Sequence, residues 1–303
     1  HKIANELATR YKDELFVINI HAGGFADDTQ YDFRTEDGNV IYQGSNVSGF
    51  PSGNVNRLSE NAIGRDIWGS YVENIIKEMA ECNVAGWVVL DKEARKATIT
   101  VEVYYTANSA SANNYINVMM LQNNIIAYQG GSSQNPDQVV NGQYRHMHVF
   151  RDAITPAWGE EIAPTTKGTF ITKTYEYDIP AKIGSFDVNI DDLEFVAFVT
   201  EKYQGKATRP ILNANKLHNI YSYNEDVHPS ILSVKESSAF SCSDNKTLKV
   251  FMANEGIAPL TSLKLEVSVD NGETETKTWE GNAVSEQIFN IELDVNVPKG
   301  KHD

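Results

Sequence analysis

The spacing of apolar residues changes twice along the chain, and each change marks a predicted domain boundary. In residues 1–84, some stretches carry an apolar residue every three or four positions, which is typical of a helix packed on a core. Others are short continuous apolar runs, such as LFVINI at 15–20, which indicate a strand covered on both faces. The predicted elements are a helix from 3 to 13, strands at 15–20 and 54–57, a weak helix at 35–43 and a helix at 59–82. This part is therefore predicted to be an α/β domain.

The longest predicted helix is the one at 59–82. Ser59 is placed to cap its first turn, because a serine side chain accepts a hydrogen bond from a backbone N–H that has no partner within the helix. The apolar residues expected to form its buried stripe are Ile63, Ile67, Ile75, Ile76 and Met79. In this interpretation the helix ends at Cys82.

From residue 85 to residue 225, short segments alternate apolar and polar residues, as in ATITVEVYY at 97–105. The other predicted strands are 115–121, 125–128, 170–177, 193–200 and 210–220. The strands at 115–121 and 125–128 are expected to form a hairpin across Gln122-Asn123-Asn124. A polar loop follows at 129–142, and loops of this length are often functional. Together these strands predict a β-sandwich domain.

Residues 226–303 alternate with the same two-residue period. The alternating segments are 248–252, 263–269 and 289–295, and Asp270-Asn271-Gly272 is a hairpin turn signal between the last two. This pattern predicts an immunoglobulin-like sandwich. Because such domains usually have about 100 residues, we expect the domain to be incomplete, with a final strand after Asp303.

The composition is that of a folded, acidic protein. The chain has 303 residues, of which 41% are hydrophobic, and a formal net charge of −15. Such an excess of negative charge repels nucleic acid and anionic lipid, so nucleic-acid partners are excluded. No apolar run reaches the roughly 20 residues that a membrane helix needs, and the first residues do not have the pattern of a signal segment.

Two histidines, His146 and His148, form the sharpest candidate for a metal site. In a strand, residues i and i+2 point to the same side, so both imidazoles are expected to face one ion. A third ligand would come from another segment, and the candidates are Asp137, Asp152 and His218. The alternative is that both histidines hold their strand in place through hydrogen bonds. No cofactor is expected.

The remaining reactive side chains give weaker indications. Cys82 and Cys242 lie in different predicted domains, and neither stands at a helix N-terminus, where a thiolate would be stabilised. The aspartates at 27–28, 191–192 and 244 do not follow the spacing of a calcium-binding loop. The motifs of serine hydrolases, phosphate-binding loops and zinc proteases do not occur. A non-enzymatic protein is therefore favoured over an enzyme.

Three pairs of sequence blocks carry a family resemblance. They are VINIHAGGFA at 17–26 with GFPSGNVNR at 49–57, NVMMLQNNIIAYQ at 117–129 with YRHMHVFR at 144–151, and EFVAFV at 194–199 with ILNANKL at 211–217. As a set they resemble the outer membrane protein 28-related family of surface lipoproteins in Bacteroides-type bacteria. The resemblance implies a thioredoxin-like domain at 1–84 that lacks its first strand, a β-sandwich domain at 85–225 and an immunoglobulin-like domain at 226–303. It also implies a place in the cell envelope, at the outer membrane surface or in the periplasm, with a lipid anchor on a cysteine upstream of His1.

A thioredoxin-like domain carries a proline, often cis, before a sheet strand, and Pro51 stands at that position. The edge beside such a proline receives an extended peptide, so Phe50 is a candidate apolar contact and Arg57 a candidate charge. His21 follows a predicted strand, and ligands bind at strand ends in open α/β sheets. The alternatives are a rigid loop at Phe50-Pro51 that only sets the direction of the strand, and a capping role for His21.

The leading hypothesis is a surface-exposed binding or adhesion protein with a protein or peptide partner, attached to the outer membrane only through its anchor. The second is a thiol-disulfide exchange protein, because many members of the family carry Cys-x-x-Cys just before the helix that begins here at His1. The third is a scaffold placed beside other envelope proteins. The precursor sequence upstream of His1 would discriminate between the first two.

Overall fold

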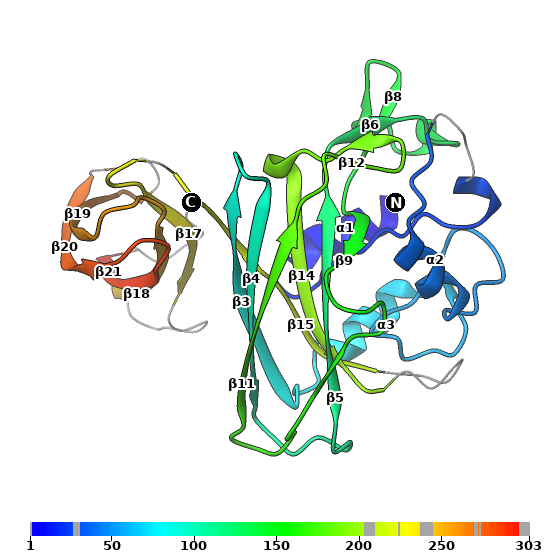
Figure 1. Ribbon diagram of the computed structural model, residues 1–303, viewed down its shortest axis with the longest axis horizontal. Coiled ribbons are helices and arrows are strands. Elements are labelled where there is room, and N and C mark those ends of the chain that lie inside the picture. Colours follow the sequence, from blue (N-terminus) through cyan, green and yellow to red (C-terminus); the bar gives the residue numbers. More distant parts are fainter. Residues whose placement is uncertain are drawn as a thin grey trace. The chain divides into compact units, whose positions relative to one another are not determined.

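In the computed structural model the chain forms two compact units (Figure 1). Unit 1 comprises His1–Val88 and Ala94–Asn219, and unit 2 comprises Val89–Glu93 and Ile220–Asp303. The structure describes residues 2–26, 31–202, 210–223, 225–236, 245–269, 272 and 274–296. Strands dominate these residues, which confirms the β-rich part of the predicted fold. The finer division into a thioredoxin-like domain, a β-sandwich and an immunoglobulin-like domain stays a prediction.

The helices of the described residues are short, and the α-helices among them belong to the first part of unit 1. The α-helices are α1 (Lys2–Arg10), α2 (Glu36–Gln43) and α3 (Trp68–Ile75), and the 3₁₀ helices are η1 (Gly24–Ala26), η2 (Ser132–Gln134), η3 (Pro136–Gln138) and η4 (Ile190–Asp192). The predicted helices at 3–13 and 35–43 correspond to α1 and α2. Helix α2 begins at Thr35, whose side chain accepts a hydrogen bond of 3.0 Å from the N–H of Gly38. Glu36 and Asp37 then place negative charge in its first turn, where the helix dipole favours it.

The strand predicted at 15–20 is reduced to one β-bridge, between Asn19 and Val149. The N–H of Asn19 donates to the carbonyl of His148, and the N–H of Phe150 donates to the carbonyl of Asn19, both at 2.9 Å. The apolar residues of this run, Phe16, Ile18 and Ile20, pack against a core cluster that contains Phe150. The apolar residues at 15–20 are therefore explained by the burial of an extended segment, and this segment is not a strand within a sheet.

The helix predicted at 59–82 is wrong over most of its length. Residues Ile63–Gly64 form β2, which pairs with β1 (Ser52–Gly53), and only Trp68–Ile75 is helical. The indole of Trp68 donates to the carbonyl of Ile63, which folds the preceding segment back onto the helix. The helix begins at Ile67 without a side-chain cap, so Ser59 does not start it, and Met79, expected in its buried stripe, is 97% exposed.

The strand predicted at 54–57 is also wrong. This segment is a turn in which Asn56 and Arg57 have positive φ angles of 48° and 53°, and such angles are incompatible with a strand. Cys82 does not end a helix as predicted, because it is the first residue of strand β3 (Cys82–Asp91).

Unit 1 contains two larger antiparallel sheets (Figure 1). One has the order β10-β5-β14-β15, with β9 also paired to β5, and the other has the order β11-β4-β3-β16. Their strands are β3 (Cys82–Asp91), β4 (Lys96–Tyr105), β5 (Asn114–Gln122), β9 (Val149–Ala153), β10 (Glu160–Ile162), β11 (Phe170–Asp178), β14 (Leu193–Thr200), β15 (Ile211–Lys216) and β16 (His218–Tyr221). The side-chain amides of Asn213 and Asn215 on β15 donate to the carbonyls of Cys82 and Val84 on β3, which links the sheets. Every residue of β14 is buried, so this strand lies at the centre of the core.

The hairpin predicted across Gln122-Asn123-Asn124 does not form. Strand β5 ends at Gln122, whereas β6 (Ile125–Ala127) belongs to a separate three-stranded sheet of order β6-β8-β7. The other strands of this small sheet are β7 (Val139–Val140) and β8 (Gln143–His146), and β12 (Lys182–Ile183) pairs with β13 (Phe186–Asp187) nearby in the sequence. Asn124 has a φ of 58°, and Asn123 accepts the N–H of His148 at 2.8 Å. These two residues direct the chain out of the large sheet.

Unit 2 has a three-stranded sheet of order β17-β18-β21 and a two-stranded sheet of β19 and β20. The strands are β17 (Pro229–Glu236), β18 (Asn245–Asn254), β19 (Leu260–Val267), β20 (Glu275–Ala283) and β21 (Ile288–Asn296). Their alternating apolar residues meet in one cluster of Val250, Met252, Leu265, Ile291 and Leu293. Strands are therefore present where the alternation predicted them, while Asp270 and Asn271 of the expected turn lie outside the described residues. Across the described ranges, the protein has no helix with the length and apolar character needed to cross a membrane.

Candidate functional site

Five aromatic and imidazole rings pack together at the base of the small β6-β8-β7 sheet, and we call them the ring cluster. They are His21, Phe33, Tyr144, His146 and Phe186. Phe33 lies at its centre, with ring centroids 4.5 Å from His21, 4.7 Å from His146 and 4.1 Å from Phe186. The two histidines meet edge to face, 5.5 Å apart. The fold therefore brings together two of the residues that the sequence singled out, His21 and His146, although they lie far apart in the chain.

Burial sets the charge of these two imidazoles. His146, the last residue of β8, is 1% exposed, and burial lowers its pKa to about 4. The pKa of His21 is also lowered to about 4, first by burial and then by the positive charge of His146 and Arg151. Both rings are therefore neutral at pH 7, where they act as flat, largely apolar surfaces.

A buried arginine supports the cluster from β9. Arg151 is 1% exposed, and its Nη2 atom donates to the carbonyls of Ile183 and Phe186 at 2.9 and 3.1 Å. Burial lowers its pKa to about 10, so it remains a cation at neutral pH. Its hydrogen bonds fix the β12–β13 turn, which carries Phe186 into the ring cluster.

His148 makes a different set of contacts from His146. Its Nδ1 atom lies 2.7 Å from Oε2 of Glu194, which also accepts a hydrogen bond of 2.8 Å from the amide of Asn123. The other oxygen, Oε1, accepts from Nζ of Lys216 at 2.5 Å. Burial by itself would raise the pKa of Glu194, but His148 and Lys216 outweigh it and lower this pKa to about 2. We call these four residues the Glu194 network.

The expected geometry of a histidine pair on one side of a strand is not present. Strand β8 ends at His146, and His148 has a φ of 53°, so the alternation of a strand is broken between them. Of the candidate third ligands, Asp152 accepts a hydrogen bond of 2.5 Å from the hydroxyl of Tyr177. Within the described ranges, no group of three or more histidine, cysteine or carboxylate side chains is arranged to hold a metal ion. Metal binding by His146 and His148 stays a prediction.

The Phe50-Pro51 bond is cis, as the sequence interpretation anticipated. Phe50 is 44% exposed and stacks on Tyr42 of α2, with centroids 5.8 Å apart. Arg57 is placed differently from the predicted surface charge, because its guanidinium lies over the rings of Trp158 and Phe198 at 5.2 and 5.1 Å. Phe50 is therefore partly exposed beside Tyr42, and Arg57 contacts rings of its own chain. A ligand-binding role for either residue stays a prediction.

The described cysteine and aspartate residues that the sequence singled out have structural contacts rather than the features of a reactive or metal-binding site. Cys82 is fully buried, and burial raises the pKa of its thiol to about 12, so it is not a reactive thiolate. Asp192 accepts a hydrogen bond of 2.7 Å from the amide of Asn124 and thus stabilises a turn. The other residues considered, Asp27, Asp28, Cys242 and Asp244, lie outside the described residues.

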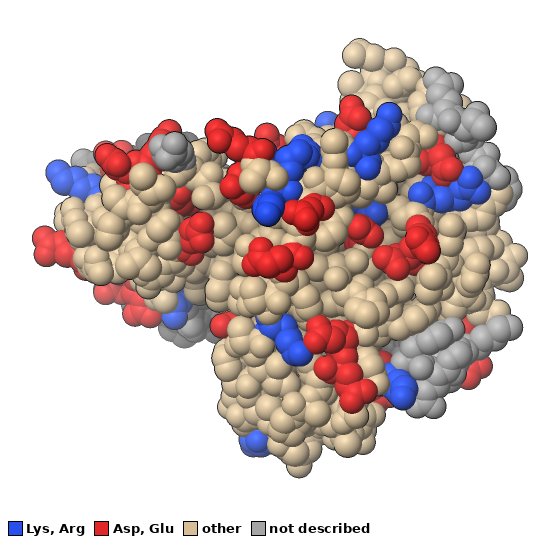
Figure 2. All heavy atoms as spheres, in the orientation of Figure 1, with Lys and Arg blue, Asp and Glu red and all other residues tan. Residues whose placement is uncertain are grey.

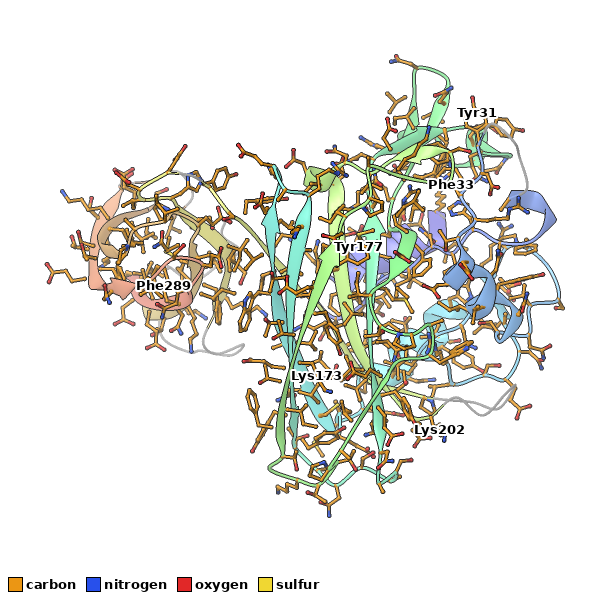
Figure 3. The ribbon with its side chains drawn as sticks, viewed as in Figure 1. Tyr31, Phe33, Lys173, Tyr177, Lys202 and Phe289 are labelled. Carbon is orange, nitrogen blue, oxygen red and sulfur yellow. The ribbon has the colours of Figure 1, made fainter. Side chains whose placement is uncertain are left out.

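The β6-β8-β7 sheet carries exposed apolar side chains above the ring cluster. Tyr128 is 65% exposed, Ile126 40% and Val139 36%, and the ring of Tyr31 lies 6.5 Å from that of Tyr128. We call these four residues the β6–β8 surface. The strands of this sheet extend beyond the large sheets in Figure 1, and Figure 3 shows Tyr31 and Phe33 beside them. On the face visible in Figure 2 the tip of this extension has no charged side chain.

Sequence reasoning missed this surface because it assigned residues 125–128 to a hairpin within the sandwich. A signal was present in the composition of the next segment. Residues 126–143 contain one charged residue, Asp137, and are rich in glycine, serine, asparagine and glutamine. Such segments are common in protein-binding loops.

Comparisons with known proteins give a family and a fold. The family model described as outer membrane protein Omp28 matches residues 39–216. The solved structure of HBP35 of Porphyromonas gingivalis is similar over 98% of this chain and 91% of its own, with 17% identity and a TM-score of 0.53. A domain of the outer membrane lipoprotein Omp28 from Porphyromonas gingivalis covers 46% of this chain and 88% of its own, with 14% identity and a TM-score of 0.29. No curated protein matches this chain.

Proposed function

Because the chain belongs to the outer membrane protein Omp28 family and is associated with the outer membrane of the cell envelope, we propose that it is a binding or adhesion protein. In this proposal its partner is another protein at the cell surface, and the contact is made by the β6–β8 surface. A lipid anchor upstream of His1 would hold the chain at the membrane and leave this surface exposed.

The observation that carries the proposal is the exposure of Ile126 on β6 and of Tyr128 directly after this strand, on a sheet that extends from the fold. A tyrosine that is 65% exposed offers a large area with few rotatable bonds, which makes tyrosine a frequent centre of binding energy at protein interfaces. The neighbouring Tyr31 and Val139 enlarge this area. The segment between β6 and β8 supplies hydrogen-bonding groups with a single charge at Asp137.

The ring cluster supports the proposal because it holds the sheet rigid. Tyr144 and His146 on β8 pack edge to face with centroids 5.0 Å apart, and the amide of Asn135 donates to the hydroxyl of Tyr144 at 2.9 Å. The guanidinium of Arg145 donates to Gln138 at 3.3 Å, which ties the η3 turn to β8. A surface that is already ordered loses less conformational entropy on binding.

The thiol-disulfide alternative gains no support from the described residues, because the Cys-x-x-Cys motif that it requires would lie upstream of His1. The scaffold alternative and the proposal predict different effects of a change at Tyr128. A scaffold without a ligand of its own would show no cell binding that depends on Tyr128.

A binding assay with the full chain tests the proposal. Labelled protein is added to cells of the organism that encodes it, and the bound amount is measured for the wild type and for the double variant Ile126→Ser with Tyr128→Ala. We expect the variant to bind at least about tenfold more weakly, as for the loss of an interface hot spot. The matched control is Tyr104→Ala with Phe170→Ala, which removes another exposed aromatic pair, 44% and 58% exposed, from β4 and β11. Equal binding by both variants, or no saturable binding by the wild type, would contradict the proposal.

A further inference from the structure

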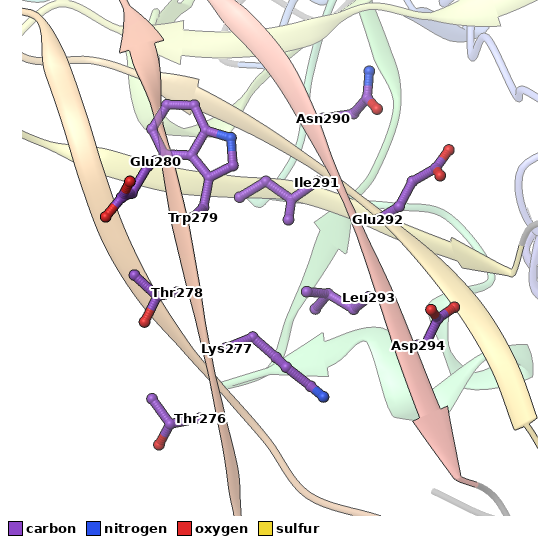
Figure 4. Close-up of a pocket in the computed structure, with 10 residues that line it drawn as sticks. All are labelled: Thr276, Lys277, Thr278, Trp279, Glu280, Asn290, Ile291, Glu292, Leu293 and Asp294. Carbon is purple, nitrogen blue, oxygen red and sulfur yellow. The ribbon is translucent and has the colours of Figure 1, made fainter.

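A groove runs between β20 and β21 in unit 2 (Figure 4). It has a volume of about 560 Å³ and is lined by residues 276–280 of β20 and 290–294 of β21. Within the described part of the chain, β20 pairs only with β19, and β21 pairs only with β18. Among the described residues, one edge of the nine-residue strand β21 has no strand partner. Such an edge is a template for a further strand, because its backbone N–H and C=O groups are already aligned.

The inner side of this edge is apolar. Ile291 and Leu293 are 7% and 5% exposed, and both point toward β20 in Figure 4. Trp279 of β20 stacks on Phe289 of β21 with centroids 4.7 Å apart and lines one end of the groove. A strand that pairs with β21 would place every second side chain beside Ile291 and Leu293. These positions require apolar residues.

The outer side of the same edge is acidic. Glu292 and Asp294 alternate with the apolar pair and point away from β20 in Figure 4. On the side of β18, Glu292 faces Lys249 at 3.9 Å, and Asp294 accepts a hydrogen bond of 2.6 Å from Thr247. No described strand supplies such neighbours on the free side. A cross-strand lysine or arginine would therefore complement both carboxylates there.

We propose that β21 binds an extended segment of a partner protein in which apolar residues alternate with lysine or arginine. The segment pairs with β21 as a fourth strand of the β17-β18-β21 sheet, with its apolar side chains in the groove and its cations beside Glu292 and Asp294. The five lining residues of β21 correspond to about 17 Å of extended chain, so the segment needs at least five residues. This surface is separate from the β6–β8 surface and does not depend on the function proposed for it.

The probe for this proposal is the peptide Lys-Val-Lys-Val-Lys-Val-Lys, acetylated and amidated at its ends and labelled for fluorescence anisotropy. Its binding to the full chain is measured at an ionic strength of about 0.15 M. A fully N-methylated peptide of the same sequence keeps the charge and the side chains but has no backbone N–H to donate. We expect saturable binding of the first peptide and at least about tenfold weaker binding of the second, because strand pairing depends on backbone hydrogen bonds.

Two protein variants complete the test. Glu292→Lys with Asp294→Lys reverses the charge at exposed positions and is expected to weaken binding at least about tenfold. Glu266→Lys, an exposed glutamate on β19, is the matched control and is expected to change affinity less than about twofold. Equal affinity for both peptides, or for both variants, would show nonspecific attraction to an acidic protein and overturn the proposal. The absence of peptide binding up to about 1 mM would also overturn the proposal. So would a dimer of this protein in solution that dissociates when Glu292→Lys and Asp294→Lys are introduced, because the edge of β21 would then bind a second copy of the chain.

Discussion

The Nδ1 atom of His148 lies 2.7 Å from the Oε2 atom of Glu194, and this contact joins the end of the β8 segment to the central strand β14. The side chain of Glu194 is 11% exposed, so its charge is poorly solvated by water. Its hydrogen bonds to His148, Lys216 and Asn123 replace the lost solvation. The Glu194 network therefore positions the turn that leads into the β6–β8 surface.

Replacement of this carboxylate should destabilise the protein. We expect Glu194→Gln to lower the free energy of unfolding at pH 7 by about 2 kcal/mol, because it removes a buried charge from its partners. The measurement is a urea unfolding curve. The matched control is Glu93→Gln, at an exposed position, where we expect a change within about 0.5 kcal/mol.

The same variant should also change the acid sensitivity. The pKa of Glu194 in the folded protein, about 2, lies below its ordinary value of 4.5. Its contribution to stability is therefore complete above pH 4.5 and is lost as the pH falls toward 2. The stability difference between wild type and Glu194→Gln should shrink over this range, and a difference independent of pH would contradict the assigned pKa.

The two histidines of the ring cluster predict a loss of stability at milder acidity. Their folded pKa values of about 4 lie below the ordinary value of 6.5, so the unfolded chain takes up protons first as the pH falls. Stability is fully present above pH 6.5 and decreases toward pH 4, by as much as about 3 kcal/mol for each ring. We expect His146→Phe to reduce this dependence between pH 7 and pH 5 in urea unfolding. Phe33→Leu, which perturbs the same cluster without removing an imidazole, should lower stability equally at both pH values.

Gly23 and Phe50 should show energetic coupling. Gly23 has a φ of 70°, and a Cβ atom there would lie 2.9 Å from Cζ of Phe50. We expect Gly23→Ala to cost about 1–2 kcal/mol from the left-handed backbone alone, and somewhat more because the Phe50 ring must shift off Tyr42. In the double variant with Phe50→Ala the extra part should vanish. A double-mutant cycle by urea unfolding measures it, and strictly additive effects would contradict the contact.

The thiol of Cys82 should be inert in the folded protein. With Cys242→Ser as background, we expect no reaction with iodoacetamide at pH 8 in native buffer and complete labelling in urea, because burial holds the pKa of this thiol at about 12. Mass spectrometry after a fixed time gives the labelled fraction. Fast labelling of the native protein would mean that Cys82 is accessible, and would contradict its assignment as a buried, protonated thiol.

The elements that the sequence predicted well are those whose pattern is local. The alternation at 97–105 and 170–177 corresponds to β4 and β11, because two-residue periodicity follows directly from a strand whose two faces differ in burial. The nearly continuous apolar run at 193–200 corresponds to β14, which is buried on both faces. The weak helix predicted at 35–43 corresponds to α2, whose cap at Thr35 acts within three residues. The helix at 59–82 failed because its apolar spacing also suits a turn and a short strand that pack on the indole of Trp68.

In the candidate site, too, the sequence indicated individual residues but not the contacts between them. His21 and His146 were each noticed in the sequence, but nothing local indicated that they share one cluster with Phe33 or that His148 belongs to the Glu194 network. The exposed β6–β8 surface likewise depends on β6 leaving the sandwich to pair with β8, a choice fixed by the contacts of Asn123 with His148 and Glu194.

The sequence by itself determined the membership in a family, the change from helical to alternating period and several of the long strands, since these depend on side chains near each other along the chain. Only the tertiary structure decided which strands pair, which histidines meet and which strand edge stays open. Those outcomes depend on contacts between residues far apart in the sequence, whose free energy is realised only when the whole core is packed.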